Sequence, residues 1–127
     1  MYPTLELDYN KLLDMVSEMG YRLMKSGAEI YRVEESIQRL LQAYGAPRGE
    51  VFAIPNCLMV SLTSPDGRPV TQIRRMPTHG TDIYLLEKYN GLCRRLCRET
   101  PAFEEALEQM EAITRTHPVS YTHLRAH

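Results

Sequence analysis

The chain has 127 residues, enough for one domain with its own hydrophobic core and too few for two. Hydrophobic residues make up 43% of it and charged residues 24%, which excludes the disordered and fibrous classes. With 15 Lys and Arg against 16 Asp and Glu, the net charge is -1, so no overall charge attracts nucleic acid and we expect no nucleic-acid partner.

Cysteine usage and hydropathy indicate the compartment. The three cysteines are an odd number, and the start of the chain lacks the apolar core of a secretory signal, which favours reduced thiols in the cytoplasm. No stretch approaches the roughly 20 apolar residues of a membrane-spanning helix. We therefore expect these residues to form a soluble, cytoplasmic unit.

Two amphipathic helices are predicted at the start of the chain. Apolar residues recur at helical spacing from Asp8 to Met24 and again from Ala28 to Tyr44. Between them, Ser26 is expected to cap the second helix, with Glu29 reaching back in a capping box. Gly45 is expected to end the second helix in a left-handed conformation.

The period changes from helical to alternating after Pro47. Apolar and polar residues alternate through residues 51–62, and a bend is expected at Pro55–Asn56. Residues 64–67 read Ser-Pro-Asp-Gly, which is typical of a tight turn. The segment 70–75 is therefore predicted to return antiparallel to the preceding strand.

Two further helices complete the predicted fold. Thr81–Asp82 can cap a third helix, and Thr100–Pro101 is expected to open a fourth. The order is helix, helix, sheet, helix, helix. This order predicts an α+β fold with two N-terminal helices, a small antiparallel β-meander and two C-terminal helices, in which helices cover one face of the sheet.

Metal and cofactor sites are not predicted. His79 is the only histidine inside the predicted fold, and Cys93 and Cys97 lie one helical turn apart, which is not the usual spacing of zinc ligands. Both cysteines fit the buried face of the third helix as small apolar side chains. We expect no metal and no cofactor.

Catalytic residues are not predicted either, although one set of residues remains a possible catalytic site. Cys57 or Ser61 could act as a nucleophile with His79 and Asp82, in a small hydrolase acting on peptides or amino-acid derivatives. The sequence lacks both a G-x-S-x-G elbow and a glycine-rich phosphate loop. The hydrolase therefore remains an alternative, as does a soluble interaction module.

A polar cluster near the second helix is the candidate ligand site. Its acidic residues fit the N-terminal end of the helix dipole, which is the structural explanation. The functional hypothesis is a pocket for a zwitterionic amino acid, in which Arg32 binds the carboxylate and an acidic side chain binds the ammonium. The candidate residues are Glu29, Tyr31, Arg32, Glu34, Asn56, Arg74 and Arg75.

The segment from Ser26 to Glu35 reads SGAEIYRVEE and resembles the signature of the N-terminal domain of the threonine/serine exporter family. The resemblance continues through residues 51–62, the Arg74–Arg75 pair, residues 80–82 and residues 89–95. It covers about nine tenths of the chain.

This resemblance implies a cytoplasmic domain followed by a bundle of membrane helices. The full-length protein would lie in the inner membrane and export threonine and serine, driven by the proton gradient. Some members of the family split the membrane part across two chains. The implied partners are the transmembrane portion of the same or a paired chain and the substrate threonine or serine; a homo-oligomer is a further expectation.

The end of the chain departs from this pattern. We expect the domain to cover residues 1–116 and a disordered or artefactual tail to cover residues 117–127. The segment Val119–His127 resembles the peptide produced when sequencing-adapter DNA is translated, and a natural flexible terminus is the alternative. The sequence is therefore interpreted as a fragment that ends before the membrane helices.

Overall fold

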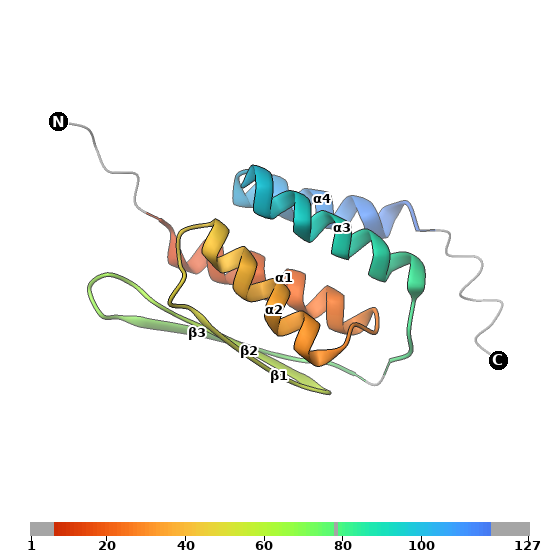
Figure 1. Ribbon diagram of the computed structural model, residues 1–127, viewed down its shortest axis with the longest axis horizontal. Helices are drawn as coiled ribbons and strands as arrows, with labels where there is room; N and C mark the ends of the chain where they lie inside the picture. Colours follow the sequence, from red (N-terminus) through yellow and green to blue (C-terminus); the bar gives the residue numbers. More distant parts are fainter. Residues whose placement is uncertain (1–6, 78, 118–127) are drawn as a thin grey trace.

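The computed structural model describes residues 7–77 and 79–117, and within them the predicted α+β fold is confirmed. Two helices come first, a three-stranded antiparallel sheet follows, and two helices end the domain (Figure 1). The elements are α1 (Tyr9–Lys25), α2 (Ile30–Ala43), β1 (Glu50–Ile54), β2 (Cys57–Thr63), β3 (Pro69–Arg75), α3 (Ile83–Glu99) and α4 (Phe103–Arg115).

These elements form three layers. The sheet is one outer layer, α1 and α2 form the middle layer, and α3 with α4 forms the other outer layer (Figure 1). Within the described residues the sheet contacts only α1 and α2, whereas α3 contacts α1 and α2, and α4 contacts α1 and α3. One face of the sheet is therefore covered and the other is open.

The position of α1 in the middle explains its composition. It packs against the sheet on one side and against α3 and α4 on the other, so apolar residues surround much of its circumference. A Cβ on Gly20 would lie 2.7 Å from the Leu58 side chain, which shows how closely the helix approaches β2. Its buried residues are Leu12, Leu13, Met15, Val16, Ser17, Met19, Gly20, Leu23 and Met24.

The sheet has the predicted alternation. Leu58, Val60 and Leu62 of β2 are buried beneath the helices, and the residues between them face outward. The order β1-β2-β3 with antiparallel neighbours confirms the predicted meander. The turn at 64–67 is also confirmed: the Gly67 N–H donates to the Ser64 carbonyl oxygen at 2.9 Å, and Gly67 has φ +85°.

Two predicted helix starts are wrong, and for the same reason. Ser26 does not cap α2: its hydroxyl donates to the Arg22 carbonyl oxygen at 2.7 Å, and it is the C-cap of α1. Thr100 likewise does not open α4; it is the left-handed C-cap of α3, with φ 39°. In both places the residue ends the preceding helix, whose last carbonyl groups need hydrogen-bond partners. The following helix therefore begins a few residues later than predicted.

The predicted cap at Asp82 has the expected geometry, because its carboxylate accepts a hydrogen bond from the Leu85 N–H at 3.1 Å. Asp8, for which no cap was predicted, caps α1 in the same way by accepting the Lys11 N–H at 3.1 Å. Gly45 has φ +88° directly after α2, as predicted.

No helix in residues 7–77 and 79–117 is long and apolar enough to cross a membrane. Of the predicted tail, only His117 belongs to the described residues. Its Nε2 lies 2.8 Å from the Asp82 carboxylate, and its ring packs edge-on against Tyr84. The segment Val119–His127, to which the adapter interpretation applies, lies outside the described residues.

Candidate ligand site at the corner between α1 and α2

The corner between α1 and α2 is built around Gly27. This residue has φ +102°, a conformation that glycine adopts without steric cost. The N–H groups of Gly27 and Ala28 donate to the carbonyl oxygens of Met24 and Leu23, both at 3.0 Å, which closes the end of α1. The chain then enters α2 at Glu29, whose side chain makes no capping hydrogen bond.

The same glycine allows the linker between β3 and α3 to pack on the corner. A Cβ at Gly27 would lie 2.7 Å from the Thr81 Oγ1 and 2.9 Å from its Cα, so any larger residue would push the linker away. The Asp82 N–H donates to the Ser26 carbonyl oxygen at 2.9 Å. Two segments far apart in the sequence are thereby fixed side by side.

Two shallow pockets of about 260 Å³ each flank this corner, and both include Gly27, Ala28 and Glu29 in their walls. The first opens toward α3 and the second toward the β1–β2 turn and the linker. The remaining residues of the first are Leu23, Arg32, Val33, Leu86 and Asn90. Those of the second are Met24, Ile30, Pro55, His79, Gly80 and Thr81.

Three of the predicted features meet at this corner. Glu29 lines both pockets, Arg32 lines the first, and Pro55 of the predicted bend lines the second. The Arg32 Nε lies 3.4 Å from the Glu29 carboxylate, and both side chains are about two-thirds exposed. Solvent screens an exposed pair of this kind, so the pair contributes little to stability and either group can exchange its partner for a ligand at little cost.

The other predicted cluster residues lie elsewhere. Tyr31 points to solvent, with the Arg32 guanidinium 5.7 Å from its ring centre. The Glu34 carboxylate accepts the Ala53 N–H at 2.9 Å and so attaches α2 to the edge of β1. Asn56 lies in the β1–β2 turn, where its carbonyl oxygen accepts the Met76 N–H at 2.9 Å.

The Arg74–Arg75 pair is divided between the two faces of the sheet. Because neighbouring residues of a strand point to opposite faces, Arg74 turns toward α1 and Arg75 turns outward. The Arg74 guanidinium lies 2.7 Å from the Glu18 carboxylate and 4.7 Å from the centre of the Tyr21 ring. Neither arginine is among the residues that line the corner pockets.

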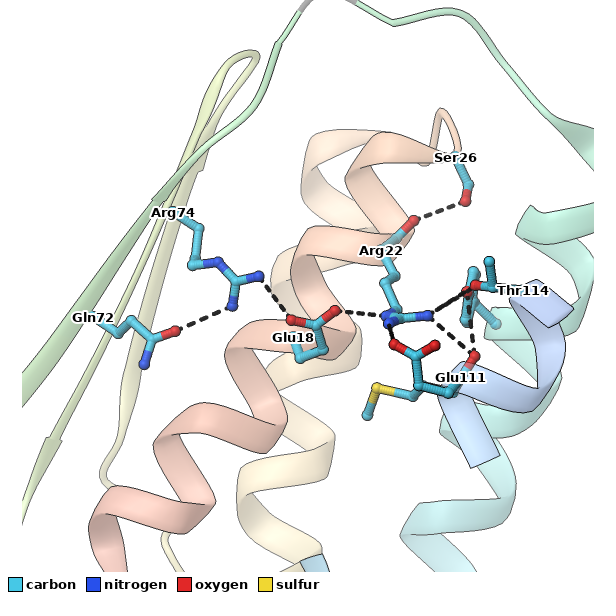
Figure 2. Close-up of polar contacts among 9 residues, drawn as sticks. Glu18, Arg22, Ser26, Gln72, Arg74, Glu111 and Thr114 are labelled. Carbon is cyan, nitrogen blue, oxygen red and sulfur yellow. Dashed lines mark hydrogen bonds and ion pairs between the residues drawn. The ribbon is translucent and has the colours of Figure 1, made fainter. Parts of the chain in front are cut away.

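Sequence reasoning missed the most highly connected polar group of the described structure. The Arg22 side chain, only 15% exposed, lies between the layers, as Figure 2 shows. Its Nε donates to Glu18 at 2.6 Å, and its other nitrogens donate to groups on α3 and α4. These acceptors are the Tyr89 hydroxyl, the Met110 carbonyl, the Thr114 hydroxyl and the Glu111 carboxylate.

Glu18 and Arg22 stabilise each other's charged states. Burial acts to raise the pKa of the Glu18 carboxyl, but hydrogen bonds from Arg74 and Arg22 outweigh it and hold that pKa below its usual value. Burial likewise acts to lower the pKa of Arg22, and the hydrogen bonds to Glu18 and Tyr89 raise it above its usual value. The spacing of Glu18 and Arg22 by four residues was the only sequence signal of this cluster.

Among the described residues, Ser61, His79 and Asp82 make separate contacts and do not form the catalytic site considered in the sequence analysis. Ser61 shares a hydrogen bond with the Thr71 hydroxyl at 3.0 Å on the outward face of the sheet. The His79 Nδ1 contacts the Gly80 carbonyl oxygen at 3.1 Å, and Asp82 caps α3. Nor does any group of three His, Cys, Asp or Glu residues in the described parts of the chain come close enough to bind a metal ion.

Comparison with known proteins identifies the class of this domain. Residues 14–125 match the model of a family of transport proteins, which indicates a transporter domain rather than an enzyme. The family is described as "putative threonine/serine exporter", and its match extends over most of the chain. The chain therefore belongs to the threonine/serine exporter family.

One curated relative has the same assignment. A protein of Mycobacterium tuberculosis (strain ATCC 25618 / H37Rv) named "Probable threonine/serine exporter" is 30% identical over 115 residues. The aligned region covers 89% of this chain and 22% of that protein, so the chain spans about a fifth of its relative's length. No solved structure matches the chain.

Proposed function

We propose that this chain forms the N-terminal, cytoplasm-facing domain of an inner-membrane exporter of threonine and serine that the proton gradient drives. The observation that carries the proposal is the family match over residues 14–125, in a domain without a membrane-spanning helix among its described residues. The transmembrane portion would lie elsewhere in the same protein or in a paired chain. The relative, of which this chain covers 22%, has ample length for such a portion.

The domain would act as a sensor or gate beside the transport pathway, and the corner between α1 and α2 would be its ligand site. Arg32 would bind the carboxylate of a small amino acid, and Glu29 its ammonium group. Three features support this role. The two groups lie in adjacent positions on one pocket wall, their mutual ion pair is exposed and weak, and the pocket is smaller than the roughly 300–1,000 Å³ typical of sites for drug-sized ligands.

The transport proposal is tested with the complete gene. The DNA downstream of the codon for Ile113 is recovered and translated, and the full-length protein is expressed in cells preloaded with labelled threonine. We expect an apolar segment of about 20 residues or more after α4 and an efflux of threonine that a protonophore abolishes. A full-length sequence without any such segment, or export that does not respond to the protonophore, would contradict the proposal.

The ligand site is tested separately on the 127-residue chain. Titration with threonine or serine, followed by amide chemical shifts, should perturb residues around Gly27 to Arg32. Arg32→Gln and Glu29→Gln should each weaken binding about tenfold or more, because each removes a charge-assisted hydrogen bond. Arg39→Gln and Glu35→Gln remove an equivalent exposed pair on the same helix and should leave binding unchanged. Equal losses in both sets of variants would argue against a site at the corner.

A further inference from the structure

The outer face of the sheet carries a contiguous apolar surface. The strand register aligns Phe52, Met59 and Ile73 in one row across all three strands, and Ile54 lies in the next row. Phe52 is 55% and Ile73 is 60% exposed. The helices all lie on the opposite side of the sheet, so nothing in the described structure covers these side chains (Figure 1).

The free edge of β1 next to this face is not available for pairing with another strand. The Glu34 carboxylate accepts the Ala53 N–H at 2.9 Å, and the Gln38 amide donates to the Gly49 carbonyl oxygen at 3.0 Å. Side chains of α2 thus occupy main-chain groups that an added strand would need. The available surface is the face of the sheet rather than this edge.

Two charged residues occupy opposite corners of this face. Glu50 of β1 shares its row with Ser61 and Thr71, and Arg75 of β3 shares its row with Cys57 and Ile54. Both are exposed. Within residues 7–77 and 79–117, neither side chain takes part in an ion pair, so both charges are open to an external partner.

We propose that this face binds a second copy of the chain in a two-fold symmetric dimer. Let the two-fold axis lie along the diagonal of the face through Ile54, Met59 and Thr71. Rotation about this axis then places Glu50 of each copy over Arg75 of the other. Outward-facing residues of one strand are about 6.7 Å apart and neighbouring strands are about 4.8 Å apart, so the rotated Glu50 position falls about 5 Å from that of Arg75 in the plane of the sheets. The two long side chains can span this gap. The two sheets cross at about 70°, which is nearer to the orthogonal than to the aligned mode of sheet packing.

Self-association fits this surface better than binding to an anionic membrane. The two charged residues among the outward-facing strand positions, Glu50 and Arg75, have opposite charges that cancel. Binding to an anionic lipid surface would instead require an excess of basic residues. In the dimer the same two charges are complementary, and they fix the orientation of the apolar row. The footprint is about 14 Å by 20 Å, so the interface is smaller than that of a permanent dimer. The dimer is therefore weak in solution and strengthened where copies are held close together. This inference does not depend on the proposed transport function.

Charge reversal tests the proposal on the 127-residue chain. Sedimentation velocity over a range of concentrations gives the dissociation constant of the dimer. Glu50→Arg and Arg75→Glu should each raise it about tenfold or more by placing like charges together, and the double variant should restore it. Glu99→Arg, on an exposed position of α3 away from the sheet, should have no effect. A chain that stays monomeric at the highest concentration, or a double variant that is not restored, would overturn the proposal.

Cysteine cross-linking tests the direction of the axis. In a background that carries Cys57→Ser and Cys97→Ser, and so lacks both partly exposed thiols, Thr71→Cys places a thiol on the proposed axis. Thr63→Cys places one on the same face but off the axis. A short bis-maleimide, whose two double bonds each add one thiol, should link two Thr71→Cys chains across the spacing of about 10 Å between the packed sheets. It should not link two Thr63→Cys chains. Linkage through position 63 instead of 71 would indicate an axis along β2 and would overturn the proposed arrangement.

Discussion

Arg22 lies at the centre of a network of hydrogen bonds and ion pairs that connects the three layers of the molecule. It extends from the middle layer to α3 and α4, while its partner Glu18 contacts Arg74 of the sheet on the opposite side (Figure 2). Every nitrogen of its guanidinium has at least one acceptor. A charge this well paired stabilises the fold only as long as all its partners are present, because a buried charge without partners is costly.

Replacing Arg22 by Met should therefore lower the free energy of unfolding by about 2–4 kcal/mol, since Glu18 and Glu111 lose their common partner while the aliphatic packing is kept. Urea unfolding followed by circular dichroism measures this loss. Arg39→Met removes an exposed pair with Glu35 and should cost less than about 0.5 kcal/mol. Similar small losses in both variants would mean that the Arg22 cluster contributes nothing beyond a surface ion pair.

Gly27 is constrained twice, by its backbone conformation and by its contact with Thr81. Gly27→Ala should cost at least about 2 kcal/mol, because it combines left-handed strain with a steric clash. Gly45 has a similar positive φ, but a Cβ there would meet nothing within 4 Å, so Gly45→Ala should cost only about 1 kcal/mol. Thermal unfolding of the two variants isolates the contribution of the contact. Equal losses would show that the linker adjusts without cost.

At the scale of elements, α2 contacts both the hydrophobic core and the edge of the sheet. Its apolar side packs into the core, where Ile37 and Leu40 are completely buried, and its side chains Glu34 and Gln38 reach the edge of β1. The regular spacing of the apolar side was readable from the sequence. The contacts of Glu34 and Gln38 were not, because both residues look like ordinary surface positions in a periodic pattern.

Leu40→Ala should lower the free energy of unfolding by about 2–5 kcal/mol, since a fully buried side chain leaves a cavity. Denaturant unfolding with an unchanged m-value would measure it. Gln42→Ala, at an exposed position of the same helix, is the matched control and should change stability by less than about 0.5 kcal/mol. A small loss at Leu40 would contradict the observed orientation of the helix.

At the scale of the whole molecule, stability should fall in acid. The pKa of Glu18 is lower in the folded state than its usual value of 4.5, so its contribution to stability is complete above that value. That contribution is lost as the pH falls through the folded-state pKa. Urea midpoints measured from about pH 7 down to about pH 3 should decrease in the unmodified chain.

In Glu18→Gln the same pH series should be flatter, with a lower midpoint already at neutral pH. Glu104→Gln is the control: its carboxylate pairs with Lys11 on the surface, where solvent screens the interaction. An acid dependence as steep in Glu18→Gln as in the unmodified chain would show that other carboxylates control the acid stability.

The sequence by itself determined the order of elements, the face that each one buries and the family. Periodicity of 3.6 or 2 residues is a local property, so the sequence alone was sufficient to assign Leu40 and Val60 to the core. The break between the first two helices near Gly27 could likewise be read directly, because turn chemistry depends on neighbouring residues, although the capping role expected of Ser26 was wrong.

Only the tertiary structure decided which residues meet across the layers. It separated Arg74 from Arg75, attached Glu34 to β1, and placed Thr81 against Gly27. It also showed that Ser26 and Thr100 end helices rather than begin them. These outcomes depend on how the helices and the sheet pack, and packing is set by contacts between residues far apart in the chain, which no local pattern encodes.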